Sequence, residues 1–167
     1  MDLYILRHAI AVPHGTSGYE QDSERPLTKK GKDKMLRIAE GLRAFDLSFD
    51  LILSSPFPRA KQTAQIVADV FGAKKVLEYT DHLTVGGDPE NLVDEIQKKY
   101  ADRQSIMLVG HEPYLSGLIS VLVSGSANLS ITMKKGGLCK LTGDTLQYGR
   151  CATLEWLLVP SQMTRIG

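Results

Sequence analysis

The chain has 167 residues, of which 20 are basic and 19 are acidic, so its formal net charge is +1. This length is close to the commonest size of a single domain, and the balanced charge excludes a general electrostatic footprint for nucleic acid or for an acidic membrane. With no signal peptide and no run of about 18 apolar residues, we expect one domain over residues 1–167 in a soluble cytoplasmic protein that binds neither nucleic acid nor membrane.

The first predicted strand is the apolar run at residues 4–9, which reads Tyr-Ile-Leu-Arg-His-Ala. A run of this length with polar boundaries is typical of a fully buried strand, so its end should bring Arg7 and His8 to the rim of a sheet. The polar stretch that follows, Val12 to Pro26, is long enough to be a functional loop that covers this rim.

Thr28 has the character of an N-cap and predicts that a surface helix begins after it. Residues 50–53 predict a second strand, followed by Ser54-Ser55-Pro56 and by a helix that begins at Pro58 and ends at Gly72. Arg59 would then lie in the first turn of that helix.

The second half of the chain first continues this alternation and then changes. The pattern predicts a short strand at 75–79, a helix at 89–100, a strand at 105–109 that leads to His111, and a helix opened by Pro113. Alternating strands and helices indicate a mostly parallel α/β sheet with helices on both faces. Residues 130–141 and 153–159 resemble strands near glycine turn signals, so we expect an antiparallel C-terminal addition to the sheet.

Cys139 and Cys151 are the only cysteines, and neither stands at a metal-ligand spacing. We therefore expect neither a metal nor an organic cofactor. The two thiols could pair if their segments were adjacent strands, but an intracellular setting favours free thiols.

Three predicted strand ends together supply two histidines and two arginines. A single histidine after a strand is more often a hydrogen-bonded structural residue than a catalyst, and a single arginine in a first helical turn is usually a solvated surface charge. Ligands of open α/β sheets, however, bind outside the carboxyl ends of the strands. The combination of these residues at one such edge therefore favours a site for one anion.

Three segments carry a resemblance to a known family: Leu6-Arg7-His8-Ala9, Ser54-Ser55-Pro56-Phe57-Pro58-Arg59-Ala60-Lys61-Gln62-Thr63-Ala64, and Val109-Gly110-His111-Glu112-Pro113. In this order they resemble the motifs of the histidine phosphatase superfamily, which has the phosphoglycerate mutase-like fold. The small size, the Arg25-Pro26-Leu27-Thr28 segment and Lys135-Gly136-Gly137 are most similar to the bacterial SixA-type phosphohistidine phosphatases. That subgroup lacks a cap insertion, so the resemblance implies an open site suited to a protein substrate.

The resemblance implies a role for each site residue. His8 would be the nucleophile that becomes phosphorylated, while Arg7, Arg59 and a protonated His111 would bind the phosphoryl oxygens. Arg25 would either reach the phosphate or the substrate from the long loop, or simply pack against that loop as a surface residue.

The superfamily's mutases use a carboxylic acid to protonate the leaving group, and their motif has no clear match here. Glu112, directly after His111, is the best candidate for a general acid, although an acid at a helix start is often favoured by the helix dipole alone. A phosphohistidine substrate needs less acid catalysis, because imidazole is a better leaving group than an alkoxide.

The sequence therefore predicts a metal-independent phosphatase, with phosphohistidine on a signalling or phosphotransfer protein as the favoured substrate. One alternative is a phosphatase of small phosphomonoesters. The other is a non-catalytic phosphohistidine-binding module, which would have no reason to keep His8. A monomer is expected, although no residue pattern fixes the oligomeric state.

Overall fold

The computed structural model describes residues 1–166 and contains one six-stranded sheet with the strand order β3-β2-β4-β1-β5-β6. The strands are β1 (Asp2–Arg7), β2 (Leu51–Ser54), β3 (Leu77–Tyr79), β4 (Ser105–Gly110), β5 (Leu138–Thr142) and β6 (Thr153–Leu158). The first four strands run parallel, whereas β5 and β6 pair antiparallel to their neighbours. The predicted parallel α/β sheet with an antiparallel C-terminal addition is confirmed.

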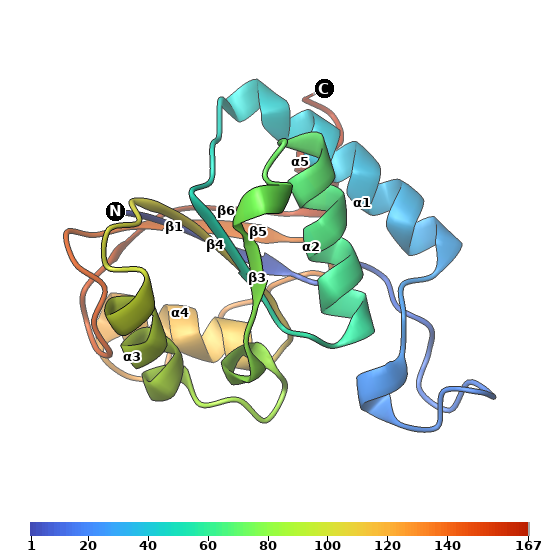
Figure 1. The fold of residues 1–167 in the computed structure, drawn as a ribbon, viewed down its shortest axis with the longest axis horizontal. Coiled ribbons are helices and arrows are strands. Elements are labelled where there is room, and N and C mark those ends of the chain that lie inside the picture. Colours follow the sequence, from blue (N-terminus) through green and yellow to red (C-terminus); the bar gives the residue numbers. More distant parts are fainter. Residues whose placement is uncertain (167) are drawn as a thin grey trace.

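Helices cover both faces of this sheet (Figure 1). One face carries α1 (Lys29–Leu42), α2 (Pro58–Val70) and the short α5 (Pro160–Met163), and the other carries α3 (Pro89–Lys99) and α4 (Tyr114–Ser124). Within residues 1–166, no helix has the length and apolarity that crossing a membrane would require.

The central strands are apolar throughout because alternate residues enter different cores. In β1, Leu3 and Ile5 pack in the core with α3 and α4, whereas Tyr4 and Leu6 pack in the core with α1 and α2. All four side chains are buried. A strand covered on both faces shows no polar alternation, and this is the pattern that identified β1 in the sequence.

The predicted strand at 130–141 is wrong over most of its length, because β5 begins only at Leu138. The Gly137 amide donates to the carbonyl of Lys134 at 2.7 Å, and Gly136 has a φ of 78°, so a turn stands where the strand was expected. The Gly136 amide also donates to the carbonyls of Arg7 and His8. This turn therefore supports the carboxyl end of β1.

Candidate functional site

All six residues predicted for the site line one cavity of about 620 Å³ at the carboxyl ends of β1 and β4. They are Arg7, His8, Arg25, Arg59, His111 and Glu112. Because β1 and β4 are parallel neighbours with Arg7 paired to Gly110, His8 and His111 follow the two strands at the same edge of the sheet. Their ring centroids lie 5.2 Å apart.

The backbone at His8 is fixed from two sides. The His8 amide donates to the carbonyl of Gly110 at 3.0 Å, and the next amide, that of Ala9, donates to the Thr63 hydroxyl at 3.0 Å. Thr63 itself donates to the carbonyl of Arg59 at 2.7 Å, one turn earlier in α2. The residues Arg59 and Thr63 thus lie on the same side of α2, which places the arginine next to the end of β1.

The His8 ring is held in one tautomer. Its Nδ1 lies 2.7 Å from the carbonyl oxygen of Ala9, which can only accept, so Nδ1 carries the proton and Nε2 keeps a lone pair. Burial lowers the pKa of His8 to about 3, and the nearby His111, Arg59 and Arg7 act in the same direction. His8 is therefore a neutral imidazole with a free Nε2 at neutral pH.

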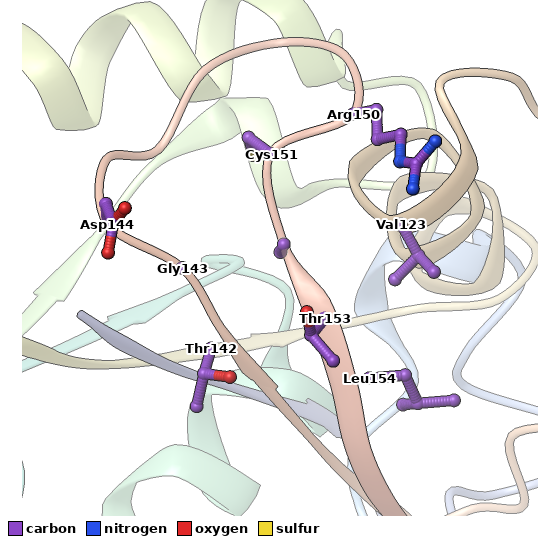
Figure 2. Close-up of a pocket in the computed structure, with 9 residues that line it drawn as sticks. Val123, Thr142, Gly143, Asp144, Arg150, Cys151, Thr153 and Leu154 are labelled. Carbon is purple, nitrogen blue, oxygen red and sulfur yellow. The ribbon is translucent and has the colours of Figure 1, made fainter.

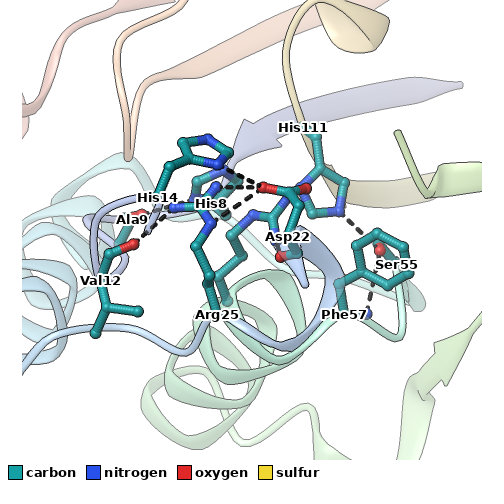
Figure 3. Close-up of polar contacts among 10 residues, drawn as sticks. His8, Ala9, Val12, His14, Asp22, Arg25, Ser55, Phe57 and His111 are labelled. Carbon is teal, nitrogen blue, oxygen red and sulfur yellow. Dashed lines mark hydrogen bonds and ion pairs between the residues drawn. The ribbon is translucent and has the colours of Figure 1, made fainter. Parts of the chain in front are cut away.

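His111 is also neutral in this environment, because burial and the charge of Arg59 lower its pKa to about 3. Its Nε2 lies 2.8 Å from the Ser55 hydroxyl (Figure 3). The oxygen of that hydroxyl accepts a hydrogen bond from the Phe57 amide at 3.3 Å, so its own proton is available for Nε2. When the hydroxyl donates to Nε2, the ring proton lies on Nδ1, a buried atom without a hydrogen-bond partner among residues 1–166. The expected protonated His111 would thus require a bound anion.

The guanidinium groups of Arg7 and Arg59 approach the cavity from β1 and from the first turn of α2. Arg59 is only 2% exposed, so it is not the solvated surface charge that is usual at a helix start. Arg7 donates from Nη1 to the carbonyl of Met133 at 2.7 Å. The Nε atoms of both arginines are buried and have no partner within the described part of the chain.

Asp22 was not predicted, yet it lies at the centre of the polar contacts (Figure 3). It belongs to a short 3-10 helix, Asp22–Glu24, within the long loop. Its carboxylate pairs with Arg25 at 2.7 Å, with Arg59 at 2.8 Å and with His14 at 3.4 Å. His14 is exposed, and it lines the mouth of the cavity.

Arg25 is buried beside this carboxylate, with 7% of its surface exposed. It also donates from Nη1 to the carbonyl of Val12 at 2.6 Å, which ties the two ends of the loop together. Arg25 is therefore not the predicted surface residue, because its buried side chain braces the loop and lines the cavity. Its contact with a phosphate or a substrate stays a prediction.

Glu112 lines the cavity but is engaged by the helix that follows. Its Oε1 accepts from the Ser116 amide at 2.8 Å, in the first turn of α4. This contact satisfies one of the free amides at a helix start, which is the alternative role expected for an acid at this position. The other carboxylate oxygen is the one that would be free to act on a substrate.

The charges of the lining favour a divalent anion. The four cationic side chains, Arg7, Arg25, Arg59 and Lys135, face two carboxylates, so the lining has a formal net charge of +2 with the histidines counted as neutral. A phosphate monoester carries about −1.5 to −2 at pH 7. Within residues 1–166, no group of three or more His, Cys, Asp or Glu side chains is arranged to hold a metal ion.

A larger cavity of about 770 Å³ lies at the opposite end of β5, around Thr142 and Gly143 (Figure 2). Its charged lining residues are Asp144 and Arg150, and it contains none of the predicted site residues. Cys151 lies at this cavity and Cys139 is buried in the sheet, and both are free thiols. Burial raises the pKa of Cys139 to about 12, which keeps its thiol protonated.

Comparison with known proteins gives one family. The model of the histidine phosphatase superfamily (branch 1) matches residues 3–102. The chain is 30% identical over 165 residues to the phosphohistidine phosphatase SixA of Escherichia coli K12, with 98% of this chain and 96% of the relative covered.

Solved structures agree with this assignment. The structure of the protein histidine phosphatase SixA complexed with tungstate superposes with a TM-score of 0.81 at 26% identity, covering 98% of this chain and 99% of that one. The alpha-ribazole phosphatase from Shigella flexneri has the same fold, with a TM-score of 0.74 at 19% identity and coverages of 96% and 97%.

Proposed function

The chain belongs to the histidine phosphatase superfamily and is a hydrolase, and we propose that it removes the phosphoryl group from phosphohistidine on a signalling or phosphotransfer protein. Three buried nitrogens carry the proposal: Arg7 Nε, Arg59 Nε and His111 Nδ1 have no hydrogen-bond partner within residues 1–166. They belong to residues that line the cavity together with His8, whose Nε2 keeps a lone pair. Buried donors without partners are costly, and a phosphoryl group supplies the missing acceptors.

In the proposed first step, His8 Nε2 attacks phosphorus in line with the leaving group. The new N–P bond forms as the bond from phosphorus to the substrate nitrogen breaks, and the released imidazole takes a proton from solvent. Arg7, Arg59 and His111 stabilise the charge spread over the phosphoryl oxygens. As the anion approaches, it favours protonation of His111, which then becomes a cationic donor.

In the second step, a water molecule attacks the phosphorus of phosphorylated His8. The N–P bond breaks, His8 regains its lone pair, and the water's proton leaves to solvent or to the phosphate. The neutral His8, fixed by the Ala9 carbonyl, is the form required to start the next cycle.

Two features support phosphohistidine over other phosphorylated groups. One carboxylate oxygen of Glu112 accepts a hydrogen bond from the backbone of α4, and an imidazole leaving group has little need of a general acid. The similar SixA of Escherichia coli is named a phosphohistidine phosphatase. A small phosphomonoester is the second candidate, because the fold is shared with an alpha-ribazole phosphatase and the charge of the cavity suits any phosphate dianion.

The deciding experiment compares kcat/KM for a phosphorylated histidine-containing protein domain with kcat/KM for a panel of sugar and nucleotide phosphates. We expect the protein substrate to be preferred by at least about 100-fold, a gap of about 2.7 kcal/mol in transition-state binding. Equal or better turnover of a small phosphomonoester would make the second candidate the correct one. Binding without turnover of any substrate would indicate a recognition module.

The nucleophile is tested with His8→Asn, because the asparagine amide can keep the hydrogen bond to the Ala9 carbonyl while removing Nε2. We expect the variant to fold and to lose turnover by about 10⁴-fold or more, since the covalent step is lost. Quenching the wild type in alkali, where phosphohistidine survives, should trap labelled phosphate on His8. Label on another residue, or near-normal activity of the variant, would reject this role, and chelators should leave wild-type activity unchanged.

A further inference from the structure

The Asp22 carboxylate bridges two buried guanidinium groups. Its Oδ1 accepts from Arg25 Nε at 3.0 Å and from Arg25 Nη2 at 2.7 Å, while its Oδ2 accepts from Arg59 Nη2 at 2.8 Å. The main-chain oxygen of Asp22 accepts from Arg59 Nη1 at 2.6 Å. Figure 3 shows the Asp22 carboxylate with dashed contacts to Arg25 and to His14.

Two buried cations this close repel each other and have each lost hydration, so they need a shared counter-charge. Burial lowers the pKa of Arg59, the charge of Arg25 lowers it further, and Asp22 acts in the opposite direction. Without the carboxylate, we expect the two guanidinium groups to separate or to move toward solvent.

Asp22 does not exhaust the donors of Arg59. A guanidinium carries five N–H groups, and Asp22 accepts from Nη1 and Nη2 while the buried Nε has no partner within residues 1–166. Asp22 thus fixes the guanidinium group of Arg59 through Nη1 and Nη2, and the group keeps other N–H donors for a ligand in the cavity that Arg59 lines.

We propose that Asp22 is a positioning residue that orients Arg59 for the transition state. Its negative charge also lowers the affinity of the pocket for released phosphate. This inference rests on the proposed role of Arg59 as a donor to the phosphoryl group. Although partial burial acts the other way, the hydrogen bonds and charges of Arg25 and Arg59 hold the pKa of Asp22 below its ordinary value. Asp22 is therefore ionised near neutral pH and has no proton to give as a general acid.

Removing this charge should affect turnover and anion binding in opposite directions. An asparagine has one oxygen and one amide group, so it can accept from one guanidinium but presents donors to the other. The pocket also gains one net positive charge. The transition state should lose a well-placed donor while the ground-state dianion is attracted more strongly.

The test introduces Asp22→Asn into the full chain. It measures kcat for an aryl phosphate, and the Kd of inorganic phosphate by calorimetry. We expect kcat to fall by about 10- to 100-fold, as misplacement of a catalytic group does. Phosphate should bind about 3- to 10-fold more tightly, because a like charge near the anion is removed. Asp22→Glu, which keeps a carboxylate, should restore part of kcat and the weaker phosphate binding.

The matched control is Glu24→Gln, which removes the same unit charge from an exposed residue of the same 3-10 helix. It should leave kcat and phosphate binding unchanged. Weaker or unchanged phosphate binding in Asp22→Asn, or unchanged kcat, would overturn the inference, since a merely structural role has no reason to tighten anion binding. A wild type inactive on every phosphorylated substrate would instead refute the proposed function, and the phosphate titration would still test the charge effect.

Discussion

His8 and His111, the two buried histidines that line the cavity, have different hydrogen-bond partners and are therefore suited to different chemistry. His8 donates from Nδ1 to a carbonyl, so its Nε2 keeps a lone pair, whereas His111 contacts a serine hydroxyl and its Nδ1 has no partner in the part of the chain that the structure describes. A carbonyl fixes the tautomer of its partner, but a hydroxyl can donate or accept. These contacts suit His8 to its proposed role as the nucleophile, and they would let His111 change protonation when an anion binds.

Substrates with different leaving groups distinguish two roles for Glu112, general acid or acceptor of a helix amide. If the free oxygen of Glu112 acts as a general acid, Glu112→Gln should slow an alkyl phosphate by about 100-fold or more while sparing an aryl phosphate and a phosphohistidine peptide. If Glu112 only accepts from the Ser116 amide, the variant should cost under about 1 kcal/mol of stability and affect all three substrates alike. We expect the second result, measured as kcat/KM for the three substrates.

The sequence predicted those site residues that lie next to a recognisable element boundary. Arg7 is the last residue of β1, His8 and His111 directly follow β1 and β4, and Arg59 follows the proline that opens α2. Asp22 could not be predicted in this way, because its partners are set by how the long loop folds back over the sheet edge. The only local signal was its position three residues before Arg25, a spacing too common to indicate a pair.

At the scale of elements, the start of α1 is fitted closely against the segment that leaves β1. Thr28 caps the helix by accepting from the Gly31 amide at 2.9 Å, and the Thr28 amide donates to the Ile10 carbonyl at 3.0 Å. A Cβ on Gly31 would lie 2.1 Å from that same carbonyl oxygen. The absence of a side chain at Gly31 therefore lets the helix approach the active-site edge.

This contact predicts opposite effects for two glycine substitutions in helices. Gly31→Ala should destabilise the fold by about 1–3 kcal/mol, because the backbone must shift to relieve the clash. Gly117→Ala in α4, where no atom lies within 4 Å of the added Cβ, should stabilise it by up to about 1 kcal/mol through helix propensity. Urea denaturation of both variants measures these changes, and a stabilised Gly31→Ala would contradict the close fit.

Element boundaries were less predictable than element types. The strand expected at 75–79 is only Leu77–Tyr79, because residues 74–76 form a 3-10 turn at the edge of the sheet. Edge strands have one neighbour, so few contacts determine where they begin. The interior strand β4, by contrast, has its apolar run buried and ends at Gly110, directly before His111.

For the molecule as a whole, the buried histidines predict how stability changes with pH. The folded-state pKa of His8 and of His111 is about 3, below the ordinary value of 6.5. Below pH 6.5 the unfolded chain takes up protons that the folded chain does not, so stability is full above pH 6.5 and is lost as the pH falls toward 3. Each histidine can remove up to about 1.4 kcal/mol per pH unit in this window.

Urea denaturation at pH 7.0 and at pH 5.5 measures this loss. His8→Asn should show a smaller difference between the two pH values than the wild type, because one of the two groups that titrate on unfolding is gone. Equal differences would show that His8 does not carry the effect. Asp22 and Glu95 have lowered pKa values, so their loss of stability lies at lower pH, below the ordinary range of carboxylates.

The position of β1 in the sheet determines when the cavity can exist during synthesis of the chain. Residues 2–7 leave the ribosome before the two segments with which they pair, residues 105–110 on one side and 138–142 on the other. Pairings this distant in sequence form slowly and only after most of the chain is available. The segment that matches the family model, residues 3–102, holds β1 and neither of its neighbours. A nascent chain halted before residue 138 thus carries His8 before β1 has gained its β5 neighbour, and we expect the cavity to assemble only after that segment has been made.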